Sequence, residues 1–243
     1  MISILIIILA ILAVAGLAYL IVNKLPKKFK PVLSIVLWVF ILFFGYKIYD
    51  SIMEPIHFNK EKRIRYAKVI ENLKTIRDAE LAYAEVYRKF TAKPEQLINF
   101  IEKDSFAITE VKNIVVTEQR GRITIDVEKR IVDTTGFRPV KDDFIGRDYK
   151  NMMKVPGTNA QFELKTGQVE KVQGVKTSVF EARVKKDVIL EGLAKDLIRQ
   201  ENEALGGINV PGEYITVGSL EEVNSNGNWP PFYDGKKEEK AKK

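Results

Sequence analysis

Oxygen-bearing side chains recur at steps of two near the end of the chain, in the stretch 222–227. This spacing, with Gly227 in the sixth place, follows the first half of a calcium-binding loop. The candidate ligands are Glu222, Asn224, Asn226 and Asp234. The twelfth place, which should hold a bidentate Glu, is Tyr233, and Asp234 comes one residue late. We therefore expect an Asn–Gly turn that leads the chain into Trp229 and two prolines, with calcium as the less favoured alternative.

Other residue patterns that carry chemistry are missing from the sequence. There is no cysteine, no Gly-rich phosphate loop, no GxSxG and no HExxH, and His57 is the single histidine. A hydrolase would have to use His57 as its base, about seven residues beyond an apolar segment. The neighbouring carboxylates Asp142–Asp143 and Glu221–Glu222 are expected to face water. We therefore predict that the protein is not an enzyme and needs no cofactor.

The formal net charge of +7 is concentrated in two short stretches. Residues 23–30 hold four lysines and no acid, and residues 236–243 hold five lysines and two glutamates. The rest of the chain has 30 basic and 30 acidic residues. Because a nucleic-acid-binding face needs a concentrated basic patch, we expect no nucleic-acid partner.

Two uncharged apolar stretches lie in residues 1–50, which we predict to form a transmembrane helical hairpin. The first, 2–22, has 21 residues, enough to cross roughly 30 Å of hydrocarbon as a helix. The second, 31–46, extends past Lys47 to Tyr49 and contains Trp38, an interfacial type of residue. The alternatives are a cleaved signal peptide for the first stretch and a buried core helix for the second.

Lysines in the short connector predict the orientation of this hairpin. They are Lys24, Lys27, Lys28 and Lys30. Such a cluster favours the cytoplasmic side, so everything after residue 50 would lie outside the cytoplasm, anchored in the inner (cytoplasmic) membrane. A conflicting basic group follows the second span at Lys60, Lys62, Arg63 and Arg65. It lies ten or more residues away and is partly balanced by acids. Pro55 is expected to bend or break the chain.

Residues 60–92 show the spacing of a long amphipathic helix, with apolar residues at steps of three and four. This apolar face needs cover, either from the protein's own sheet or from another copy or partner. The candidate interaction residues are Leu73, Ile76, Tyr83, Tyr87, Phe90 and Trp229. The role of Trp229, in capping the core or forming a contact patch, stays open.

Shorter elements follow, and they predict an α+β domain in which the long helix packs on a small antiparallel sheet with a second helix. A second helix is expected from Pro94. Strands are expected at 107–117 and 122–132 with one buried face, a long loop at 133–160, a hairpin at 162–172 around Thr166–Gly167, and strands at 178–184 and 214–220. A further helix is expected at 187–205. The predicted regions are 1–50 (hairpin), 51–105 (stalk), 106–234 (soluble domain) and 235–243 (disordered basic tail).

The stretch LKTIRDAELAYAEVYRKFT, behind an apolar span and ahead of a sheet, resembles a pilin or pseudopilin subunit. The residues that carry the likeness are Leu73, Ala79, Ala82, Tyr83, Tyr87 and the exit Lys89–Phe90–Thr91. The resemblance covers about 60 residues and implies a helix-on-sheet domain on a membrane stalk. The second span begins Lys30–Pro31–Val32, without the cleavage-site Gly of that family or its Glu five residues into the span.

These observations favour a membrane-anchored structural or assembly component of a cell-envelope complex. Its expected partners are membrane lipid and other envelope proteins or copies of itself. The alternative is an extracytoplasmic ligand-binding or sensory domain on a membrane anchor, with a pocket in residues 133–160.

Overall fold

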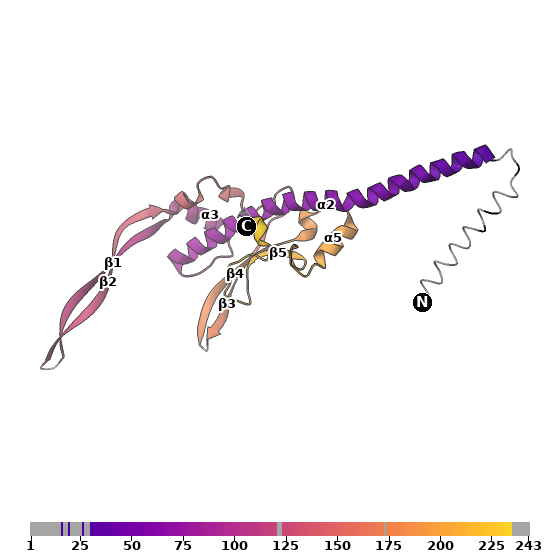
Figure 1. The fold of residues 1–243 in the computed structure, drawn as a ribbon. Helices are drawn as coiled ribbons and strands as arrows, with labels where there is room; N and C mark the ends of the chain where they lie inside the picture. The colour runs from indigo at the N-terminus through magenta and orange to yellow at the C-terminus, as the bar shows by residue number, and fades with distance from the viewer. Residues whose placement is uncertain are drawn as a thin grey trace, which may run out of the picture. The chain divides into compact units, whose positions relative to one another are not determined.

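The computed structural model describes residues 16, 19, 26, 30–120, 123–172 and 174–234. The fold is α+β, with a long N-terminal helix and two small antiparallel sheets (Figure 1). The helices are α2 (Lys30–Tyr87), α3 (Pro94–Lys103), α4 (Lys186–Ile189), α5 (Lys195–Asn202) and the 3-10 turns η2 (Val140–Phe144), η3 (Tyr149–Asn151) and η4 (Pro231–Asp234). The strands are β1 (Ser105–Arg120), β2 (Ile123–Pro139), β3 (Glu163–Val172), β4 (Val175–Lys185) and β5 (Tyr214–Gly218). The chain divides into two compact units, 1–57 and 58–243.

Helix α2 contains an apolar segment near the N-terminus that is long enough to cross a membrane, and none of that segment is buried. The second predicted span lies in this segment. The first predicted span, 2–22, lies outside the described residues, as does the tail 235–243. Of the bend or break expected at Pro55, the break is wrong, because Pro55 lies inside α2. Proline removes one backbone hydrogen bond, and the turns on either side remain helical.

The second half of α2 provides the core of the second unit. Its buried apolar residues are Phe58, Tyr66, Val69, Ile70, Leu73, Ile76, Ala79 and Tyr83. They share one hydrophobic cluster with α3 and with strands β4 and β5. The ring of Tyr83 packs edge-on against Phe100 of α3, with ring centroids 5.3 Å apart. The long amphipathic helix is therefore covered by its own domain.

The long helix ends before the predicted residue 92. Helix α2 ends at Tyr87, and Arg88 follows with a φ of 60°. This left-handed conformation stops the helix, although the apolar spacing continues to Phe90. Phe90 instead packs on Phe180 of β4, with ring centroids 4.8 Å apart. The predicted helix at Pro94 is confirmed as α3.

The three-stranded sheet has the order β3-β4-β5, with both neighbouring pairs antiparallel. The predicted strands at 178–184 and 214–220 are confirmed as β4 and β5. The predicted turn at Thr166–Gly167 is wrong, because β3 runs through it and Thr166 pairs with Phe180. The chain reverses after Val172 instead, where Gly174 has a φ of 84°. A Cβ at Gly167 would meet Leu220 and Val179 at ordinary van der Waals distances, so the strand does not require glycine at this position.

The two-stranded sheet confirms the predicted antiparallel pair in residues 105–139. The predicted loop at 133–160 is wrong in its first part, because β2 continues to Pro139 and pairs with the start of β1. The register shifts by one residue between Ile108 and Thr109, where a bulge leaves Thr135 of β2 as the extra residue. The rest of that segment contains η2 and η3.

The single helix predicted at 187–205 is replaced by the two short helices α4 and α5. Gly192, which lies between them, has a φ of 85°. This value is outside the helical region, so the chain turns at Gly192 although the apolar spacing runs on.

One carboxyl group is buried inside this core. Glu80 of α2 has no exposed surface. Its Oε2 accepts a hydrogen bond of 3.1 Å from the backbone N–H of Thr91, and its Oε1 has no partner. Burial raises the pKa of Glu80 to about 8, and the bond from Thr91 opposes this only in part. Glu80 is therefore protonated in the folded protein near neutral pH.

The raised pKa of Glu80 predicts a pH-dependent stability. In the unfolded chain the pKa of Glu80 returns to its usual value of about 4.5. The contribution of Glu80 to the free energy of unfolding is therefore complete at acid pH, and it declines as the pH rises from about 4.5 to about 8. The decline is about 1.4 kcal/mol per pH unit. The variant Glu80→Gln cannot ionise and should not show this decline. We expect its advantage in free energy of unfolding to grow by roughly 3 kcal/mol between about pH 5 and pH 8.

Urea titrations of the detergent-solubilised chain at several pH values measure this difference. Glu85→Gln is the control, because Glu85 lies on the exposed side of the same helix. If Glu80→Gln and the original chain lose stability in parallel, Glu80 is ionised in the folded state and its proposed protonation is wrong.

Candidate functional site

The hairpin of β1 and β2 exposes apolar side chains on both faces. Its register pairs Val116 with Val127, and Ile114 and Ile131 lie on the same face at the next two levels. Ile114 and Ile131 are 39% and 42% exposed. On the opposite face Val111, Val115 and Val132 are also exposed. The expectation that one face of this hairpin is buried is therefore wrong for its described residues.

A two-stranded sheet that no other element covers is unusual in a folded protein. Within the described residues β1 and β2 pair only with each other, so each strand has a free edge. A lone two-stranded ribbon is marginally stable in water, and free edges invite pairing with another chain. The hairpin thus has the backbone groups and the apolar surface that a protein partner would use. We call Ile114, Val116, Val127 and Ile131 the arm face.

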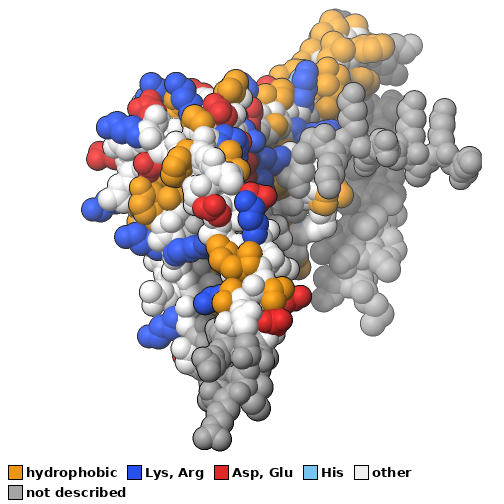
Figure 2. All heavy atoms as spheres, turned by 90° about the vertical axis from the view of Figure 1, so that its left-hand side faces the viewer, with side chains coloured by type: hydrophobic (Ala, Val, Ile, Leu, Met, Phe, Trp, Pro, Cys, Tyr) orange, Lys and Arg blue, Asp and Glu red, His pale blue; other side chains and the backbone are white. Residues whose placement is uncertain are grey.

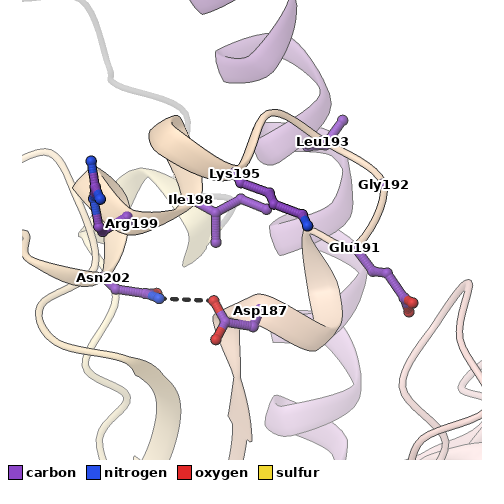
Figure 3. A pocket seen from close by; sticks show the side chains of 8 residues that line it. All are labelled: Asp187, Glu191, Gly192, Leu193, Lys195, Ile198, Arg199 and Asn202. Carbon is purple, nitrogen blue, oxygen red and sulfur yellow. Dashed lines mark hydrogen bonds between the residues drawn. The ribbon is translucent and has the colours of Figure 1, made fainter.

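A second candidate site is a pocket of about 670 Å³ between α4 and α5. Figure 3 shows Ile198 inside it, with Asp187 and Asn202 facing each other. The side-chain N–H of Asn202 donates to Asp187 Oδ1 at 2.8 Å. Lys195 and Arg199 supply positive charge on the same wall. A pocket with an apolar floor and charged side chains of both signs suits a small zwitterionic or polar ligand.

Three charged side chains are buried next to this pocket, one each on α2, α4 and α5. Lys62 Nζ donates to Glu201 Oε2 at 2.8 Å. Lys186 is fully buried, and its Nζ donates to the backbone carbonyls of Glu201 at 2.6 Å and Val210 at 2.7 Å. Burial lowers the pKa of Lys186, and the nearby Glu201 carboxylate opposes that shift. We call Lys62, Lys186 and Glu201 the ion cluster.

Two tyrosines adjoin the ion cluster, and neither is available as a base. Burial, reinforced by the charge of Glu201, raises the pKa of Tyr66 far above its usual range. The same two causes raise the pKa of Tyr233 to about 12. Both phenols stay protonated at physiological pH. The arrangement ties α2 to α5 and has little access to solvent, so its chemistry is structural.

The residues predicted to form an interaction surface lie mostly inside the protein. Leu73 and Ile76 have no exposed surface, and Tyr83 and Trp229 are 8% and 7% exposed. Phe90 is half-buried. Tyr87 is the exception at 44%, and its hydroxyl donates to Asp104 Oδ2 at 2.8 Å. The sequence left open whether the protein's own domain or another chain covers this helix, and its own domain does so.

The candidate calcium ligands lie in a turn that uses its own oxygens. Asn224 Oδ1 accepts from the N–H of Asn226 at 2.8 Å, and Asn226 O accepts from Gly218 at 3.0 Å. Gly227 then pairs with Val217 of β5. The side-chain bond of Asn224 bends the chain ahead of Asn226, but Asn226–Gly227 form no turn of their own, because Gly227 lies in an isolated bridge. Glu222 is exposed, and His57 is exposed on α2. Among the described residues, His, Asp and Glu side chains form no group of three that suits a metal.

Sequence reasoning missed the ion cluster. Its members lie at positions 62, 186 and 201, and each belongs to a segment rich in surface charges. Lys186 is preceded by Lys185, which is exposed. No spacing rule separates the buried lysine from its neighbour.

Figure 2 shows one face of the molecule, on which basic and acidic side chains are interspersed.

Comparison of the chain with family models, curated proteins and solved structures finds no match. The site is therefore interpreted from its own geometry.

The ion cluster predicts a difference between two adjacent lysines. Lys186→Met leaves the buried carbonyls of Glu201 and Val210 without their donor, which should lower the free energy of unfolding by roughly 3 kcal/mol. Lys185→Met, one residue away at an exposed position, should cost less than about 1 kcal/mol. Thermal or urea unfolding of the two variants in detergent measures the contrast. Equal stability of the two variants would contradict the structural role of Lys186.

Proposed function

We propose that this chain is a non-enzymatic, membrane-anchored structural or assembly component of a cell-envelope complex. The observation that carries the proposal is the arm face, in which Ile114 and Ile131 stay exposed on a two-stranded ribbon with free edges, away from the hydrophobic cluster of the domain. A self-sufficient soluble domain would gain by covering such a face. The partner is another envelope protein or a second copy of the chain.

The membrane part of the proposal rests on α2. Its apolar segment has the length and composition of a span, and the same helix continues into the core of the second unit. We propose two spans in the inner membrane, with the domain outside the cytoplasm, as the lysines of the connector favour. A long helix with a small sheet also supports the likeness to pilins and pseudopilins, here without their cleavage motif.

The arm face provides the test. The double variant Ile114→Glu/Ile131→Glu places two charges on exposed apolar positions, so the fold should keep its melting temperature. We expect the variant to lose most of its association with itself or its companions, because each Glu would have to be desolvated in the interface. Purification from native membranes in mild detergent, with light-scattering mass and identification of co-purifying proteins, measures this loss.

Ile145→Glu is the matched control, since Ile145 is 78% exposed and lies outside the hairpin. It should retain the mass and companions of the original chain. If the arm-face variant retains them too, the arm face is not the assembly surface.

A second candidate function, a ligand-binding or sensory domain, is favoured by the pocket between α4 and α5. This pocket lies outside the 133–160 segment, where the sequence predicted one. We expect a ligand of this pocket to raise the melting temperature of the chain, and Ile198→Asp to abolish the rise. A thermal-shift screen with amino acids, small carboxylates and inorganic ions tests this. No rise with any of these classes counts against the sensory function.

A further inference from the structure

Strand β1 has a free edge along an exposed stretch, residues 107–115. This stretch pairs with β2 on one side, and no other described strand pairs with it. All of its side chains are exposed. It holds two opposite charges, Glu110 and Lys112, on either side of Val111, and apolar residues lie at both of its ends. A free edge with exposed apolar side chains is a place where another strand can add to the sheet.

The sequence of this edge is complementary to itself. Two copies of β1 can pair antiparallel about a two-fold axis at Val111, so that each residue faces the one equally far from Val111 in the other copy. Glu110 of each copy then faces Lys112 of the other. The flanking pairs are Thr109 with Asn113, Ile108 with Ile114, and Ala107 with Val115. Because directly opposite side chains share a face, each charge meets its opposite and each apolar residue meets another.

Neighbouring registers do not show this match. A two-fold axis must pass through a residue, because facing side chains lie on the same side of the sheet. An axis at Glu110 or at Lys112 sets that charge against its own copy. An axis at Thr109 or at Asn113 sets both charges against apolar side chains. Of these five centres, Val111 alone matches every pair.

The electrostatics of the hairpin also favour a second copy. Within the hairpin Glu110 faces Asp133 of β2. Like charges directly opposite each other destabilise a sheet. Lys112 of the same strand offsets this repulsion, since its Nζ lies 3.0 Å from Glu110 Oε2. Pairing of two copies brings a second ammonium next to Glu110, on the edge that β2 leaves free.

The edge of β2 suits such pairing less well. Its bulge leaves Thr135 as an extra residue, and a bulge disrupts a regular edge. Glu128, Lys129 and Arg130 follow one another in the middle of the strand. An axis at any of these sets a charge against its own copy, and an axis at Ile131 sets Arg130 against a valine. The regular edge of β1 is therefore the better one for a second copy.

We propose that two copies of this chain associate through the free edges of β1, paired antiparallel about Val111 into one sheet of order β2-β1-β1-β2. The inference rests on the assembly role proposed above and deepens it, because it commits the partner to a second copy. Backbone hydrogen bonds along the edge and an ion pair on each side of the axis hold the two copies together. The wider sheet is more stable than the lone ribbon, and Ile114 of the arm face packs against Ile108 of the second copy.

A single cysteine on the proposed axis tests the register, because the chain has no cysteine of its own. In the pair, the two copies of residue 111 have their Cα atoms about 4.5–5.5 Å apart, a distance that a disulfide spans. We expect mild oxidation of full-length Val111→Cys in mild detergent to link most of the chains into dimers on a non-reducing gel.

Val115→Cys is the matched control. Val115 lies on the same face of β1 and is 63% exposed, against 46% for Val111. In the proposed register its two copies lie roughly 27 Å apart along the strands, so Val115→Cys should stay unlinked. Absence of a linked dimer in Val111→Cys, or equal linkage in the two variants, would overturn the proposal.

Reversing each charge in turn gives a complementation test. Glu110→Lys puts two lysines, and Lys112→Glu two glutamates, next to the axis, so each variant repels its own copies. We expect either change to weaken self-association roughly tenfold or more, as measured by sedimentation. In an equimolar mixture the lysines of one variant face the glutamates of the other, so association should return to within about threefold of the original. Failure of the mixture to associate would contradict the register.

The folding of the two charge variants is checked by their melting temperatures. Both side chains are exposed, and a surface ion pair contributes less than about 1 kcal/mol, so the melting temperatures should stay close to the original.

Proteins that co-purify from native membranes separate the failure of this inference from that of the assembly role. If Val111→Cys does not link but envelope proteins co-purify through the arm face, the partner is another protein and the assembly role stands. If the chain neither links nor retains companions, both proposals fail.

Discussion

The need to cover the apolar face of α2 governs the structure of the second unit. A helix gains little stability by itself, so the face from Tyr66 to Tyr83 must be buried against something. Here α3, β4 and β5 bury it, and the hydrophobic cluster they form extends to Val210 and Trp229. The same helix also contains the segment of membrane length.

The ion cluster adds a second constraint to this core. A buried ammonium is tolerated when carbonyls and a carboxylate replace its water shell, and Lys186 has all of these from Glu201 and Val210. Lys62 shares the same carboxylate, so one glutamate joins α2, α4 and α5. The cluster thereby attaches both ends of the loop after α5 to the core.

The arm face stays exposed after these requirements are met, and it is proposed to meet a protein partner. It lies on a ribbon with free backbone edges, which suits a protein chain.

Local patterns in the sequence determined the membrane-length segment of α2, helix α3, the hairpin pair and strands β4 and β5, because each is decided by spacing within a few residues. Patterns failed where a backbone conformation overrode spacing: at Arg88, at Gly192 and at Gly167, where an apparent turn is a packed strand position. Tertiary structure alone decided which surfaces are covered. Leu73 and the arm face show equally good apolar periodicity, yet one is buried and the other exposed, because burial depends on segments far apart in the chain. The pairing of Lys62 with Glu201 depends on such distant contacts in the same way.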